Sequence, residues 1–117
     1  MLVTSRETHR WVLPKGWAEK HLSGPELAAK EAFEEAGLVG AVAAKKLGTY
    51  SYVKMMPKGR SVVCRVDVFP TQVETILDEW PERLQRERRW FTPAQAAMEV
   101  EEGELVLLLL NLALPEG

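Results

Sequence analysis

The chain has 117 residues, with 15 Lys and Arg against 17 Asp and Glu and a formal net charge of −2. A hydrophobic share of 46% and a charged share of 27% predict a single folded domain over residues 1–117 and exclude a disordered tail. The near-neutral charge argues against a protein that binds nucleic acid, and the longest apolar run, Leu105–Leu110, is far shorter than the ~20 residues of a membrane helix. The single cysteine, Cys64, excludes an internal disulfide framework, so we expect a reducing, cytoplasmic setting.

The first half of the chain predicts strands around one capped helix. Ser23 suits the N-cap, Pro25 the first turn, and Glu26 completes a capping box. The helix is expected to continue to Ala36 and to end at Gly37. Strand-like segments along the whole chain are 2–5, 11–13, 42–47, 48–55, 61–69 and 88–91.

The last quarter of the chain predicts two helices. Thr92 is expected to cap a helix from Pro93 to about Glu101. A second, very apolar helix from Glu104 to Leu114 is expected to pack in the core. Helices mixed with strands predict an α/β or α+β domain with one main sheet.

Three carboxylates, those of Glu31, Glu34 and Glu35, lie close together on the first helix. At about 100° of rotation per residue they share one face, opposite the small residues that pack inward. Neighbouring carboxylates repel each other, and a hard divalent cation such as Mg²⁺ would turn that repulsion into attraction and leave waters for a phosphate to replace. The alternative is a solvated acidic face of a surface helix.

The wider spacing favours the metal-binding interpretation. Residues 16–38 resemble the Nudix box, G-x5-E-x7-R-E-U-x-E-E-x-G-U, where U is a bulky aliphatic residue. The positions that match in register are Gly16, Glu31, Glu34, Glu35, Gly37 and Leu38. Segments 10–17, 79–82 and 86–97 are also similar to the subgroup of diphosphoinositol polyphosphate phosphohydrolases and diadenosine polyphosphate hydrolases.

Three box positions depart from the family pattern: Leu22 replaces the first Glu, Lys30 the Arg, and Ala32 a larger aliphatic residue. In the family, the first Glu and the Arg support each other and the catalytic Glu. Glu26 lies four residues before Lys30, the favourable helical order for an ion pair, so we expect this pair to replace the lost one in part. The alternative is that Glu26 serves only the capping box.

The resemblance implies a Nudix-like α/β/α sandwich with a mixed β-sheet, without the usual N-terminal strand. It implies attack of water on a phosphoanhydride with Mg²⁺ as cofactor, or Mn²⁺ as the alternative. Glu31, Glu34 and Glu35 match the family's metal ligands. The resemblance leaves the general base open between Glu31 and Glu87, and a charged strand end is the simpler interpretation of Glu87.

A phosphorylated small-molecule substrate is also implied, and basic side chains suit it because Arg forks match phosphate oxygens. The candidates for phosphate contact are Lys15, Gly16, Arg65, Arg86 and Arg88. Ion pairs with nearby Glu residues are the alternative for each Arg. The four Trp residues could stack a base, although packing explains Trp11 and Trp90 better, because both lie in strand-like runs.

Relatives of this subgroup carry a first strand, and the start of a second, before the point that matches Leu2. A sheet without that strand would expose unpaired backbone groups. We therefore expect either a longer upstream coding region or a second copy of the chain that covers this edge in a homodimer.

The leading hypothesis is a metal-dependent hydrolase of dinucleoside polyphosphates or diphosphoinositol polyphosphates. Nucleotide-pool cleansing and removal of an RNA 5′-pyrophosphate are alternatives within the enzyme class. A binding or regulatory module with weak or no catalysis is the alternative outside it, and the changes at Leu22 and Lys30 favour it.

Overall fold

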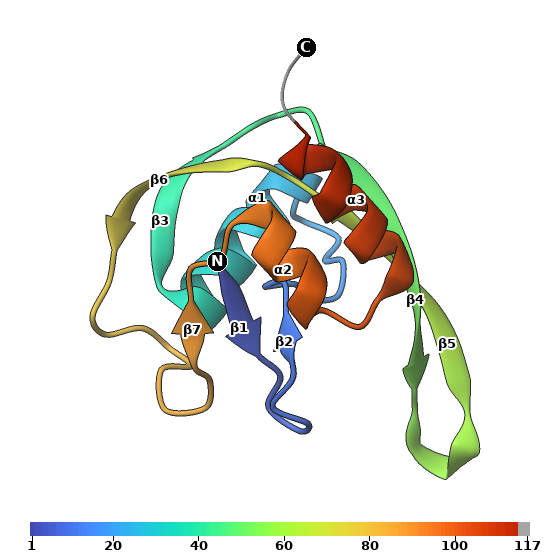
Figure 1. Cartoon of the computed structure of the whole chain (residues 1–117). Helices are drawn as coiled ribbons and strands as arrows, with labels where there is room; N and C mark the ends of the chain where they lie inside the picture. The colour runs from blue at the N-terminus through green and yellow to red at the C-terminus, as the bar shows by residue number, and fades with distance from the viewer. Residues whose placement is uncertain (115–117) are drawn as a thin grey trace.

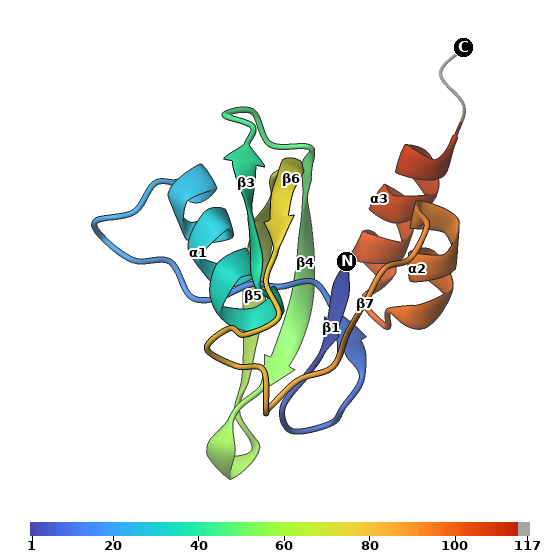
Figure 2. The same ribbon diagram turned by 90° about the vertical axis from the view of Figure 1, so that its left-hand side faces the viewer.

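The computed structural model describes residues 1–114, so the last three residues of the predicted domain lie outside the described range. Three layers form the fold (Figure 2): α1 (Gly24–Ala36) lies on one side of the strands, and α2 (Pro93–Glu99) and α3 (Gly103–Ala113) lie on the other. The strands are β1 (Leu2–Thr4), β2 (Trp11–Val12), β3 (Leu38–Val42), β4 (Gly48–Met55), β5 (Ser61–Val68), β6 (Thr71–Ile76) and β7 (Arg88–Arg89), with a 3₁₀ turn, η1 (Pro57–Gly59), between β4 and β5 (Figure 1). The predicted α/β architecture is confirmed.

The strands form three small antiparallel sheets over the described residues, in the orders β2-β1-β7, β3-β6 and β4-β5. The expectation of one mixed sheet is therefore wrong for this part of the chain. A parallel pair needs a long crossover connection, whereas β4 and β5 form a hairpin joined by a tight turn. Because β1 pairs on both of its edges, the free edges of its sheet belong to the two-residue strands β2 and β7. The homodimer stays a prediction.

The helix boundaries agree with the sequence, but one strand does not. Ser23 forms the expected capping box and Thr92 the expected N-cap, completed as a capping box by Gln95, and Gly37 ends α1 in the left-handed conformation with φ 66°. The strand predicted at 42–47 is wrong: β3 begins directly after Gly37 and ends at Val42. Its partner β6 was not predicted, because its pairing with β3 joins residues 29 to 38 positions apart.

Strand β1 separates two apolar cores because its side chains alternate. Leu2 packs with Tyr50 and Leu105 beneath α2 and α3, whereas Val3 packs with Ala36 beneath α1. Strand β1 therefore packs against both helical layers, the one that carries the carboxylates and the one opposite.

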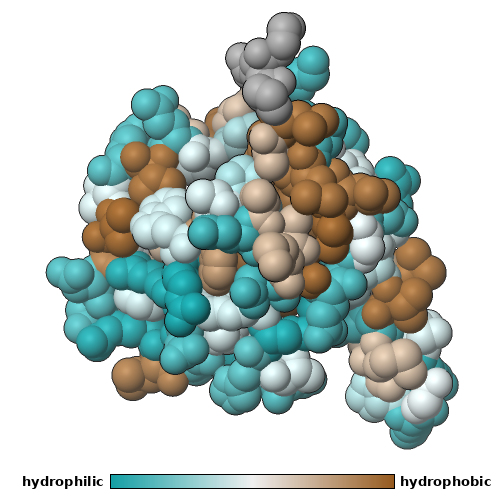
Figure 3. Space-filling model, viewed as in Figure 1, coloured by the Kyte–Doolittle hydropathy of each residue, from teal (hydrophilic) through white to brown (hydrophobic). Residues whose placement is uncertain are grey.

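Helix α3 is only partly buried, which corrects the expectation of a core helix. Leu105 and Leu109 face the core, while Leu107, Leu110 and Leu112 are exposed. Figure 3 shows these apolar side chains gathered over α3. Among the helices of residues 1–114, none has the length and apolar character that crossing a bilayer requires.

Candidate active site

The C-terminal end of α1 is held in place by two side chains from the connection that leads to β7. The Trp80 indole N–H donates to the carbonyl of Glu35 at 3.0 Å, and Arg88 donates to the carbonyl of Ala36 at 2.8 Å. The Arg88 guanidinium lies 3.8 Å from the centre of the Trp80 ring. These contacts satisfy carbonyls that the end of a helix leaves free, and they occupy Arg88 with protein groups. A phosphate contact for Arg88 stays a prediction.

The carboxylate of Glu35 is buried, with 4% of the residue exposed. Burial first, and then a hydrogen bond with the Glu31 side chain, raise its pKa to about 8 against the opposing effect of the Arg86 guanidinium. The raised pKa means that the Glu35 carboxyl is predominantly protonated below about pH 8 when no cation is present. The structure therefore brings together the first and last of the three predicted carboxylates.

Gly16 brings the backbone of the loop before α1 against this pair. A Cβ atom at position 16 would lie 2.5 Å from the carboxyl carbon of Glu31, so a side chain here would displace the carboxylate. This close approach is a physical reason for glycine at the start of the box.

Lys30 has partners that the sequence did not indicate. Its ammonium forms a hydrogen-bonded ion pair with Glu19 and lies 4.0 Å from Glu34. Glu26 instead accepts from the backbone N–H of Ser23 at 2.9 Å, so the expected Glu26–Lys30 ion pair is wrong within the described residues and the capping alternative is right. Glu19 was missed because the conformation of residues 17–23 is set by tertiary contacts, not by helical spacing.

Arg86 binds three protein groups at the buried end of the carboxylate pair. It donates to Glu82 at 2.8 Å and to the backbone carbonyl of Thr4 at 3.1 Å, and its guanidinium lies 3.5 Å from Glu35. Ion pairing with a nearby Glu, the alternative to a phosphate contact, is thus what the structure shows for Arg86. The four-residue spacing of Glu82 and Arg86 was the signal for this contact.

Lys15 is the basic side chain placed between the carboxylates and the β4–β5 hairpin. Burial lowers the pKa of its ammonium, the Glu35 and Glu102 carboxylates oppose that shift, and Lys54 adds to it. The ammonium also lies 5.1 Å from the centre of the Tyr52 ring. Lys15 is therefore a cation close to the predicted catalytic carboxylates, as its predicted phosphate contact requires.

Two other predicted site residues lie apart from this group. Arg65 pairs across the hairpin with Ser51, so it points to the face opposite Tyr52 and its neighbour Lys15. Glu87 is joined to Thr4 only through its backbone, and no ion pair involves its side chain within the described residues. Roles for Arg65 and Glu87 stay predictions.

The carboxylate oxygens of α1 are the groups in this site that could bind a divalent cation. Over residues 1–114, no three His, Cys, Asp or Glu side chains converge closely enough to hold a metal ion. The Glu31 and Glu35 oxygens nevertheless lie within hydrogen-bonding distance of each other and are the donor type that Mg²⁺ prefers, so this pair fits a cation. Glu34 lies beside Lys30, and its place as a third ligand stays a prediction.

Several curated proteins similar to this chain are Nudix hydrolases. The chain is similar to the Arabidopsis thaliana proteins Nudix hydrolase 12, mitochondrial (35% identical over 102 residues, 82% of this chain and 49% of the relative) and Nudix hydrolase 18, mitochondrial (32% over 96 residues, 82% and 52%). It is also similar to Nudix hydrolase 4 of the same plant (32% over 96 residues, 82% and 44%). The chain belongs to the Nudix hydrolase superfamily.

Membership of the superfamily leaves the substrate, the metal ion and the cellular location of this chain as predictions. The chain spans about half the length of the curated Nudix relatives it matches, and no family model matches it. The relatives' names place several of them in mitochondria and one in chloroplasts, so a cytoplasmic location stays a prediction for this Nudix chain.

Proposed function

We propose that the chain hydrolyses a phosphoanhydride bond in an organic substrate that carries a diphosphate or a longer polyphosphate. The observation that carries the proposal is the contact between the buried Glu35 and the partly buried Glu31 on α1, with the Gly16 backbone against Glu31 and the Lys15 ammonium nearby. Family membership supports the same reaction class.

The reaction balances as a hydrolysis. A water oxygen forms a new bond to phosphorus, the bridging P–O bond breaks, and the proton of the water passes to a carboxylate. A divalent cation, Mg²⁺ or Mn²⁺, supplies charge neutralisation at the phosphate and helps to ionise the water when it is bound.

The chain's own residues prepare the site for that step. Glu31 and Glu35 supply the oxygen ligands, and the Arg86 guanidinium and the backbone contacts of Trp80 hold Glu35 in its buried position. Lys15 stabilises negative charge on the phosphate. The candidates for the general base are Glu31 and Glu87.

The substrate class that we propose is a dinucleoside polyphosphate or a diphosphoinositol polyphosphate. The test is formation of mononucleotide products from diadenosine tetraphosphate, and release of orthophosphate from a diphosphoinositol polyphosphate, each with Mg²⁺ and with EDTA. We expect Mg²⁺-dependent turnover that falls at least about 100-fold in Glu34→Gln and Glu35→Gln. Glu99→Gln, an exposed site on the opposite layer, is the matched control and should keep full activity.

A binding module without catalysis is the second candidate, and the Leu22 and Lys30 departures favour it. It would be supported by ligand binding without Mg²⁺-dependent turnover of either substrate, a result that would refute the hydrolase proposal for these substrates.

A further inference from the structure

Trp17 is an exposed aromatic residue that follows directly in sequence the glycine that packs against Glu31. It follows Gly16, whose backbone contacts the Glu31 carboxylate, and 59% of the Trp17 residue is exposed. Lys54 of β4 lies over the ring, with its ammonium 5.2 Å from the ring centre. The ring is therefore accessible to a ligand that reaches the loop before α1, and an indole can stack on a flat aromatic group.

A second pair of the same kind lies between Trp17 and the carboxylates. Lys15 lies over the Tyr52 ring, and Tyr52 and Lys54 occupy alternate positions of β4, so they share one face of the hairpin. Lys54 also lowers the pKa of Lys15, which places the two ammonium groups near each other. Two cations and two rings therefore extend from the carboxylates along the hairpin.

This arrangement matches a nucleotide better than it matches an inositol polyphosphate. Cations flanking a phosphate chain suit both ligands, but only a nucleobase has a flat π face that stacks on a ring. The inositol ring is saturated and carries no such face.

We propose that Trp17, oriented by Lys54, is the stacking platform for the nucleobase of the substrate, with Lys15 and Lys54 on its phosphate chain. The choice of ligand rests on the proposed function. The inference assigns the substrate to the dinucleoside polyphosphate class and makes Trp17 the residue that determines this specificity.

Binding of ADP to the whole chain, measured by calorimetry in EDTA, tests the platform, with inorganic pyrophosphate as the probe that lacks a base. We expect Trp17→Ala to weaken ADP binding about 5- to 140-fold and to change pyrophosphate binding less than about twofold. Trp17→Phe keeps an aromatic face and should stay within about threefold of the parent chain.

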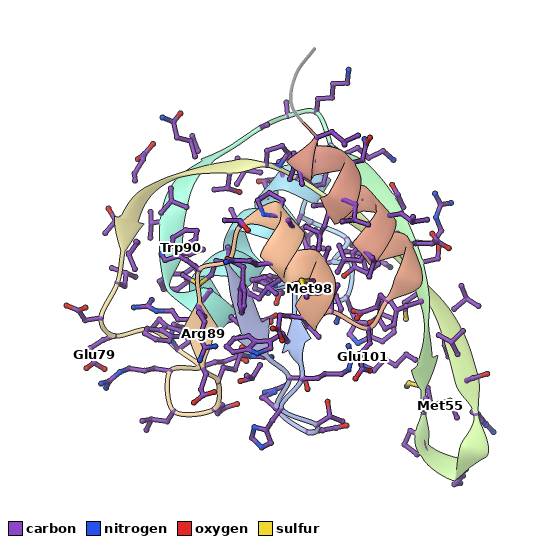
Figure 4. The ribbon with its side chains drawn as sticks, in the orientation of Figure 1. Met55, Glu79, Arg89, Trp90, Met98 and Glu101 are labelled. Atoms are coloured by element: carbon purple, nitrogen blue, oxygen red, sulfur yellow. The ribbon has the colours of Figure 1, made fainter. Side chains whose placement is uncertain are left out.

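Trp90→Ala is the matched control, because Trp90 is 53% exposed and Figure 4 shows it far across the body from Met55 on the β4–β5 hairpin. It should leave ADP binding unchanged. The proposal is overturned if the parent chain does not bind ADP, if Trp17→Ala leaves ADP binding unchanged, or if it weakens ADP and pyrophosphate equally.

Steady-state kinetics separates this inference from the proposed hydrolysis. Trp17→Ala should raise KM for diadenosine tetraphosphate and leave kcat within about threefold, because stacking lies away from the reacting phosphorus. If turnover is absent while ADP binding depends on Trp17, hydrolysis fails and the platform stands. If turnover is present but KM is unchanged in Trp17→Ala, hydrolysis stands and the platform fails.

Discussion

Replacing Glu35 by Gln should stabilise the metal-free protein while it removes activity. Glu35 is 4% exposed, and burial raises its pKa from the ordinary 4.5 to about 8. The folded protein therefore holds a proton that the unfolded chain releases between these two pH values. The free energy of unfolding of the parent chain should fall as the pH rises from about 4.5 to about 8. Gln has nearly the same shape and does not titrate.

The expected gain in the free energy of unfolding follows from the difference between the two pKa values of Glu35. The rise from 4.5 to about 8, at about 1.4 kcal/mol for each pH unit, sets a ceiling of about 5 kcal/mol. Relaxation around the charged group reduces the effect, so we expect Glu35→Gln to be about 2–4 kcal/mol more stable at pH 8. The difference should vanish near pH 4, where the parent carboxyl is protonated in both states.

Urea unfolding in EDTA at several pH values from 4 to 9 measures this difference, with Glu99→Gln as the control that should follow the parent. Adding Mg²⁺ should then stabilise the parent chain at pH 8 and stabilise Glu35→Gln less, since binding to the folded state adds to its stability. Parallel curves for parent and Glu35→Gln from pH 5 to pH 8 would refute the argument that burial of the charge costs stability.

Four further substitutions test the surroundings of the site. Gly16→Ala should displace the Glu31 carboxylate and lower kcat at least about 10-fold, with a smaller change in KM; unchanged kinetics would contradict the close approach. Glu19→Lys and Lys30→Glu should each weaken Mg²⁺ binding several-fold, because each breaks the ion pair beside Glu34. The double variant with both substitutions should recover part of the lost affinity. If the losses are instead additive, the ion pair does not position Glu34. Arg88→Met should destabilise the protein by about 1–3 kcal/mol in urea unfolding, because it removes the hydrogen bond to the end of α1; a raised KM at unchanged stability would instead support a phosphate contact.

Helix α1 could be predicted almost completely because its determinants are local. The Ser23 capping box, Pro25 in the first turn and the left-handed Gly37 are contacts within a few residues of each other. Helical rotation alone put the three carboxylates on one face. The sequence by itself therefore determined the helix, its ends and the register that resembles the Nudix box.

Tertiary structure decided which of these side chains act together, because the deciding contacts join distant parts of the chain. The partner of Lys30 is Glu19 in the preceding loop, and Arg86 reaches the Thr4 carbonyl across 82 positions. The pairing of β3 with β6 was missing from the sequence for the same reason.

The sequence did not determine which of the carboxylates on α1 is buried. Helical spacing treats Glu34 and Glu35 as equivalent members of one acidic face, yet the structure buries Glu35 and leaves Glu34 partly exposed beside Lys30. Solvent exclusion depends on every layer that packs around a group, so no local pattern encodes it. The sequence determined where the carboxylates lie on the helix, and tertiary packing decided that Glu35 is buried and has a raised pKa.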